Sequence, residues 1–130
     1  KNRQLMAVRK EKGKISITNY KTIKIFQNTN LPKISLINCQ LETGRTHQIR
    51  VHMNFKGNSI LGDKSYGKTK KKFKKIDPKI KDKINSFDRQ ALHAKILGFV
   101  HPTTKKEIFF EAKRPKDFDN LIKNLKKSSL

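Results

Sequence analysis

Residues 41–52 read Leu-Glu-Thr-Gly-Arg-Thr-His-Gln-Ile-Arg-Val-His, a pattern that predicts a strand ending in a turn and continuing as a helix. Gly44 interrupts the strand, and either Thr43 or Thr46 can cap the helix that follows to residue 55. At 100° per residue, Arg50 lies among apolar residues on more than one side of this helix. A partly desolvated arginine needs a carboxylate or phosphate partner. The acids available within the chain are Glu42, Asp63 and Asp88.

Alternation of apolar and polar residues predicts strands on both sides of this stretch, at 5–8, 14–26, 33–42, 91–100 and 107–112. A short extended piece is expected at 60–63. In the strand at 14–26, the odd-numbered isoleucines should line one face; they are Ile15, Ile17, Ile23 and Ile25.

Two further helices are expected beside the one at residues 46–55. A short basic helix should begin at Pro78, with Asp77 as its cap, and an amphipathic helix should begin at Pro115. The inward residues expected in the last helix are Phe118, Leu121, Ile122 and Leu125. The combined pattern predicts an α+β protein with a mixed, mostly antiparallel β-sheet flanked by helices.

The chain is strongly basic, with 32 Lys and Arg against 10 Asp and Glu and a formal net charge of +22. Charge this unbalanced points to a nucleic-acid partner, although a lysine-rich coding bias would also raise the count. Residues 68–83 hold nine lysines, which predict a basic loop as far as residue 76. A length of 130 residues corresponds to a single domain.

Other features of the sequence argue against disulfides, metal sites and membrane-spanning segments. The single cysteine, Cys39, excludes disulfides and a four-cysteine zinc site, and it is expected to be a reduced thiol in a cytoplasmic protein. His47 and His52 lie about 140° apart around a helix, so they cannot bind one metal ion together. No metal site is expected, and no apolar run approaches the ~18 residues of a membrane span. The segment 43–46 is either a phosphate-binding corner or an ordinary capped turn.

Taken together, the motifs resemble those of the RluA-type ribosomal RNA pseudouridine synthases. Residues 41–52 are similar to the third signature motif of that family, and 60–67 (Ile-Leu-Gly-Asp-Lys-Ser-Tyr-Gly) to its continuation. Residues 87–94 (Phe-Asp-Arg-Gln-Ala-Leu-His-Ala) and 99–102 (Phe-Val-His-Pro) resemble the last block, in the style of the RluD branch. The resemblance implies isomerisation of uridine to pseudouridine in RNA without a cofactor, with large-subunit ribosomal RNA as the expected substrate.

The resemblance also implies roles for individual residues. In this family an aspartate attacks the flipped-out nucleotide, and a tyrosine stacks on its base. Arg50 matches the basic residue that pairs with the aspartate, and Leu92 matches the aliphatic residue that packs against uracil. The residues expected to contact RNA are Thr43, Gly44, Arg45, Thr46, His47, Gln48, His52, Tyr66, Lys70, Lys71, Lys72, Arg89 and His93.

The family motifs that hold the aspartate (R-L-D-x-x-T) and the tyrosine (Y-x-A) have no match in this chain. Residues 1–130 are therefore expected to be the C-terminal portion of a single catalytic domain, with the N-terminal catalytic half and any S4-like domain outside the chain. Such a portion should be inactive alone and is expected to be monomeric. The alternative is a non-catalytic, basic RNA-binding or ribosome-assembly module.

Overall fold

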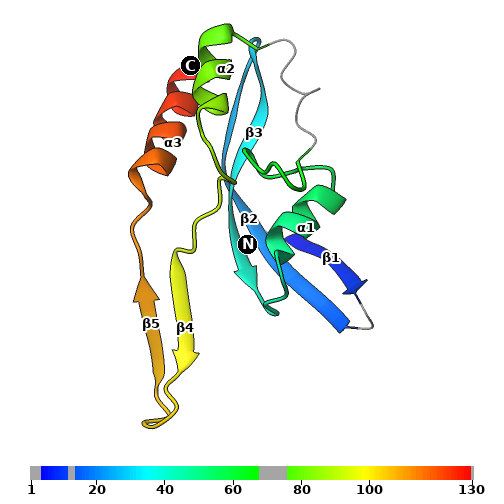
Figure 1. The fold of residues 1–130 in the computed structure, drawn as a ribbon, viewed down its shortest axis with the longest axis vertical. Coiled ribbons are helices and arrows are strands. Elements are labelled where there is room, and N and C mark those ends of the chain that lie inside the picture. The colour runs from blue at the N-terminus through cyan, green and yellow to red at the C-terminus, as the bar shows by residue number, and fades with distance from the viewer. Residues whose placement is uncertain (1–3, 12–13, 68–75, 130) are drawn as a thin grey trace.

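The computed structural model describes residues 4–11, 14–67 and 76–129, with side chains from residue 14 onward. These residues form two antiparallel sheets and three helices, which confirms the α+β class (Figure 1). The element order is β1 (Gln4–Glu11), β2 (Lys14–Asn28), β3 (Leu31–Leu41), α1 (Gln48–Phe55), α2 (Pro78–Asn85), β4 (Ile96–Val100), β5 (Glu107–Glu111) and α3 (Lys116–Ser128). The basic segment 68–75, with Lys70, Lys71 and Lys72, lies outside the described residues.

The first sheet has the order β1-β2-β3, and its long central strand buries mainly its even-numbered residues. Thr18 and Phe26 are 0% and 1% exposed, whereas Ile15 and Ile23 are each 49% exposed. The strand predicted at 14–26 is confirmed, and the face that carries the odd-numbered isoleucines is the more exposed one. Helix α1 bonds to the hydroxyl groups of Ser16 and Thr18 on the even-numbered side, and Phe26 packs in a core with residues of α2 and α3.

The second sheet is the hairpin β4–β5, which extends away from the helices and the first sheet (Figure 1). The strand predicted at 107–112 is confirmed as β5. The strand predicted at 91–100 is β4, and it begins only at Ile96. The large apolar side chains of the hairpin are exposed; they are Ile96, Leu97, Phe99, Val100, Phe109 and Phe110. Cross-strand partners share a face, so both faces of the hairpin are apolar.

The segment before β4 is irregular because it packs on a turn. The Ala91 N–H donates to the carbonyl of Leu61, 2.7 Å away, instead of joining a strand. The turn itself is closed by an Asp63 N–H bond to the Ile60 carbonyl, and Gly62 adopts a φ of 77° within it. The short extended piece predicted at 60–63 is therefore wrong, since this segment is a turn.

Helices α2 and α3 pack side by side at one end of the long β2–β3 hairpin (Figure 1). The Asp77 carboxylate accepts the Lys79 N–H at 2.9 Å, which confirms it as the cap of α2. Helix α3 follows Pro115, as expected. Its four predicted inward residues are all buried, in a core with Phe26, Leu31, Ile76, Ile84 and Phe87. No described helix has the length and apolar character needed to cross a membrane.

Candidate active site

Helix α1 begins without the cap expected from the sequence. Its N-cap residue is His47, which has a left-handed φ of 50° and forms no side-chain cap bond. The capping predictions for Thr43 and Thr46 are therefore wrong. The Thr43 hydroxyl instead accepts the Ile17 N–H at 2.9 Å and donates to Gln48 at 2.8 Å. It fixes the turn to β2.

Gln48 holds this corner to the sheet from inside the protein. Its side chain is 5% exposed, and its Oε1 accepts the Arg45 N–H at 3.0 Å. Its Nε2 donates to the Ile17 carbonyl and to the Thr18 hydroxyl, at 3.0 and 2.9 Å. The amide of Arg45 is thus engaged within the protein, which favours a braced turn over a corner of free N–H groups.

His52 secures the next turn of α1 to the same strand. The ring is 1% exposed; its Nδ1 bonds the Thr18 hydroxyl at 2.8 Å and its Nε2 the Ser16 hydroxyl at 3.0 Å. Both RNA-contact candidates on this side of the helix, Gln48 and His52, are therefore inside the protein. Their packing supports a role in placing α1 rather than direct contact with a ligand.

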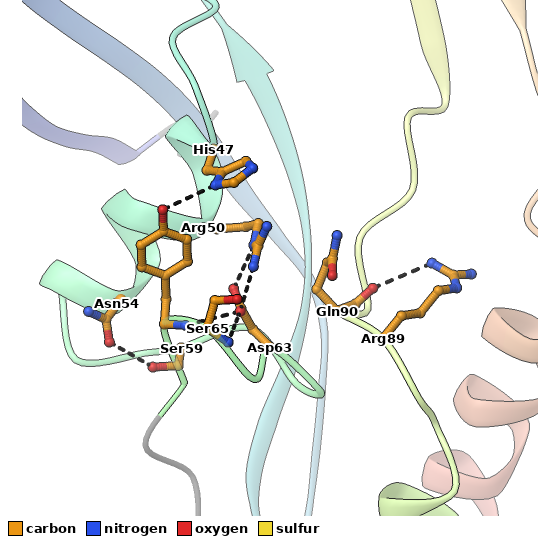
Figure 2. Close-up of polar contacts among 9 residues, drawn as sticks. His47, Arg50, Asn54, Ser59, Asp63, Ser65, Arg89 and Gln90 are labelled. Atoms are coloured by element: carbon orange, nitrogen blue, oxygen red, sulfur yellow. Dashed lines mark hydrogen bonds and ion pairs between the residues drawn. The ribbon is translucent and has the colours of Figure 1, made fainter.

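Arg50 forms a two-point ion pair with Asp63, one of the three acids available to it. The Nε–Oδ2 and Nη2–Oδ1 distances are both 2.9 Å (Figure 2). Exposure of the two side chains is 12% for Arg50 and 1% for Asp63. The backbone N–H groups of Ser65 and Tyr66 also donate to Asp63 Oδ1, each at 3.1 Å.

The ion pair shifts the pKa of both partners. Hydrogen bonding to Asp63 raises the pKa of Arg50 above its usual value, so the guanidinium stays charged. The pKa of Asp63 is lowered, chiefly by the hydrogen bond from Arg50, although burial opposes the shift. Because this pKa is lower than in an unfolded chain, the carboxylate stabilises the fold at neutral pH and loses that effect as the pH falls through its folded pKa.

Tyr66 supports the same arginine from another side. The guanidinium carbon of Arg50 lies 4.9 Å from the centre of the Tyr66 ring, within the range of a cation–π contact. The Tyr66 hydroxyl and His47 Nδ1 share a hydrogen bond of 3.1 Å. Asp63 and Tyr66, which belong to one turn, therefore both contact Arg50, and His47 is linked to it through Tyr66.

A pocket of about 270 Å³ lies against this cluster. Its lining residues are Leu41, Arg45, His47, Gln48, Ile49, Arg50, Gln90 and Leu92. The two residues with implied catalytic roles, Arg50 and Leu92, thus line one cavity, although 42 positions separate them in the sequence. Sequence reasoning missed Gln90, and its place between Arg89 and Leu92 in the last motif was the only signal for it.

The remaining predicted site residues are spread around this pocket. Gly44 and Thr46 are exposed on its corner. Arg89 instead pairs with Asp117 of α3 through two bonds of 3.1 and 3.0 Å, and His93 bonds the Ala112 carbonyl at 3.0 Å. These two contacts tie the segment between α2 and β4 to α3 and to the end of β5. Among the described residues, no cluster of three potential metal ligands occurs.

The Cys39 thiol lies on β3, is half-buried, and is not among the residues that line the pocket. Burial raises its pKa to about 11, so the thiol is protonated at neutral pH.

Comparison with known proteins gives consistent matches. A family model described as RNA pseudouridylate synthase matches residues 1–55. The chain is 46% identical over 125 residues, 95% of its length, to the ribosomal large subunit pseudouridine synthase D of Zymomonas mobilis. It is 44% identical over 128 residues, 98% of its length, to the uncharacterized RNA pseudouridine synthase YlyB of Bacillus subtilis. It spans 36% of the length of each of these relatives. The motifs, the pocket that they build and these matches agree, and the chain belongs to the RNA pseudouridine synthase family.

Proposed function

We propose that the protein containing this chain converts uridine to pseudouridine in RNA, and that large-subunit ribosomal RNA is its substrate. The observation that carries the proposal is the pocket shared by Arg50 and Leu92, which pairs a fixed cation with an apolar wall. Two relatives, from Zymomonas mobilis and Vibrio parahaemolyticus, are both named ribosomal large subunit pseudouridine synthase D, which supports the choice of RNA.

In this proposal, residues 1–130 form the C-terminal portion of the catalytic domain, and a preceding segment supplies the aspartate nucleophile. Arg50 pairs with that aspartate and orients it, because a guanidinium fork matches the geometry of a carboxylate. Leu92 packs against the uracil once the nucleotide has left its stack. The remaining chemistry is attack by the aspartate, detachment and rotation of the base, and its reattachment through C5. None of these steps calls for a cofactor.

The RNA backbone is proposed to cross the exposed corner that holds Arg45, Thr46 and His47. These side chains lie at the entrance of the pocket or next to it, and none is buried. Contacts of this kind set affinity and register, whereas the pocket selects the base. The protein is further proposed to act in the cytoplasm as a monomer, and sedimentation of the RNA-free protein tests the second point.

The decisive experiment measures tritium release from RNA labelled with [5-³H]uridine. The protein with its preceding segment should release tritium from large-subunit ribosomal RNA, since the C5 proton is lost on isomerisation. Residues 1–130 alone should release none above background. Tritium release by the isolated chain would contradict the proposed division of the site. RNA binding without any release by the longer protein would instead support the non-catalytic RNA-binding module.

The lysine run is expected to contribute electrostatic RNA binding. Replacing Lys70, Lys71, Lys72 and Lys74 with glutamine should flatten the dependence of log Kd on log salt by about 0.7–0.9 for each phosphate that is no longer neutralised. A titration of RNA binding at several salt concentrations measures this slope.

A matched control removes the same charge elsewhere, through glutamine at Lys116, Lys123, Lys126 and Lys127, which are exposed on α3. We expect the control to keep the slope of the unmodified protein. Equal slopes for both variants would show that the run at 68–75 is only a solvated segment.

A further inference from the structure

We infer that Asp63 is a positioning residue of this site: it holds one edge of the Arg50 guanidinium so that the opposite corner is presented to a second carboxylate in the pocket. The inference rests on the proposed function and deepens it. Arg50 is the arginine that is expected to hold the nucleophile. In this inference Asp63 orients Arg50 and neutralises part of its charge.

The first observation is which nitrogen atoms Asp63 occupies. Its two oxygens accept from Nε and Nη2 of Arg50, both at 2.9 Å, which is the side-on arrangement of an arginine–carboxylate pair. Among the residues that the structure describes, Nη1 makes no hydrogen bond. Arg50 also lines the pocket of about 270 Å³. The Nη1 corner is therefore the part of the guanidinium left for a ligand there.

The second observation is that Asp63 is itself held in place. It is 2% exposed, and the N–H groups of Ser65 and Tyr66 fix its Oδ1. Its carbonyl accepts the Gly67 N–H at 2.9 Å, so the backbone on both sides of the carboxylate is tied down. An acid this constrained can fix the arginine, rather than follow it.

The third observation is that Tyr66 restrains the Arg50 guanidinium from a second direction. Asp63 grips the edge of the guanidinium, while the Tyr66 ring lies 4.9 Å from its central carbon. The hydroxyl of Tyr66 is in turn bonded to His47 at the start of α1. An arginine side chain loses much rotamer freedom when it binds a ligand. Here the side chain is already ordered in the folded protein, so ligand binding costs less conformational entropy.

The pairing also changes the charge that an incoming carboxylate meets. Arg50 alone would present a full positive charge and would lower the pKa of a neighbouring carboxylate strongly. Arg50 paired with Asp63 has no net charge, so it orients a second carboxylate through directed hydrogen bonds while attracting it less. A nucleophilic aspartate held in this way keeps more of its basicity, which favours attack on the nucleotide.

The test is Asp63→Asn in the protein that releases tritium. An asparagine carbonyl can still accept the N–H bonds of residues 65 and 66, so the turn is kept while the negative charge beside Arg50 is removed. We expect kcat to fall by about 10- to 100-fold from misorientation, with KM for RNA little changed. The acidic limb of the pH–rate profile should move to lower pH, because the nucleophile now faces an uncompensated cation.

The matched control is Asp119→Asn, which removes the ion pair of 2.8 Å between Arg114, just before α3, and Asp119 in the first turn of that helix. It changes the same functional group in a pair away from the pocket, and it should leave kcat and the acidic limb unchanged. Thermal unfolding of both variants measures the structural effect of each change separately.

The outcomes separate the inference from the proposed function. An unchanged kcat in Asp63→Asn, or a loss of activity that follows lost folding with no movement of the acidic limb, overturns the positioning role. An unmodified protein that releases no tritium overturns the proposed function itself. NMR gives a readout that does not depend on activity: the Arg50 Nε–H should exchange slowly with water in residues 1–130 and faster in Asp63→Asn.

Discussion

Replacing Arg50 with alanine in the longer protein should lower turnover by at least about 100-fold, the scale seen when one fixed hydrogen-bond donor to a reacting group is removed. The expected loss is in kcat, because the pocket loses the group that is proposed to orient the nucleophile. RNA affinity should change little, since Arg50 is 12% exposed and cannot provide much of the backbone contact. Single-turnover tritium release and filter binding measure the two quantities.

Arg50→Lys provides the matched control for charge. Lysine keeps the positive charge but has no planar fork, so it cannot satisfy both oxygens of Asp63 and also offer a fixed third donor. We expect it to recover only part of the lost turnover. If the alanine variant turned over as fast as the unmodified protein, Arg50 would only stabilise the fold.

Gly62→Ala should lower the free energy of unfolding by roughly 2–5 kcal/mol, the sum expected for left-handed strain and overpacking. Gly62 has a φ of 77°, and an added Cβ would overlap the carbonyl oxygen of Arg89. That oxygen belongs to the backbone, so it cannot move aside without shifting the segment that carries Leu92. Urea unfolding followed by circular dichroism measures the loss.

Gly57→Ala separates the two contributions. Gly57 has a similar φ of 83° at the end of α1, but an added Cβ would meet nothing within 4 Å. This control should cost only about 1–2 kcal/mol, the strain of a left-handed residue. Equal losses in the two variants would mean that the contact between the 60–63 turn and residue 89 does not restrict the backbone.

The elements that were predicted well are those whose signals are local. Asp77 and Pro78 mark the start of α2, and the spacing of Phe118, Leu121 and Leu125 marks the buried face of α3. Caps and 3.6-residue periodicity act within a few residues, so they can be read directly from the chain. The signature at 41–52 likewise predicted the strand, turn and helix that it forms.

The elements that were predicted poorly depend on what packs against them. Period-two alternation in β2 identified a strand, but both of its faces carry plausible core residues, and the helices that pack on it decide which face is buried. Thr18 is buried because it bonds His52 and Gln48, which lie 30 or more residues away. A hydroxyl face looks solvent-facing until its partners are known.

In the site, too, some features follow from local sequence and others depend on packing. The family motif singled out Arg50 and Leu92, which line one pocket, and the chemistry of a desolvated guanidinium predicted the carboxylate partner that Asp63 provides. Selecting Asp63 among three acids required the turn at 60–63, which contains Gly62 and packs against residues 89–91. The sequence predicts which groups take part more readily than it predicts how a turn aims them.

The β4–β5 hairpin has a consequence for how the isolated chain behaves in solution. Leu97, Phe99 and Phe110 cover one face and Ile96, Val100 and Phe109 the other, and all six are more than 40% exposed. A two-stranded ribbon is only marginally stable by itself, and its open edges can recruit strands from other molecules. When residues 1–130 are expressed alone at high concentration, we therefore expect them to aggregate through the β4–β5 hairpin. This aggregation should occur before the helical core unfolds.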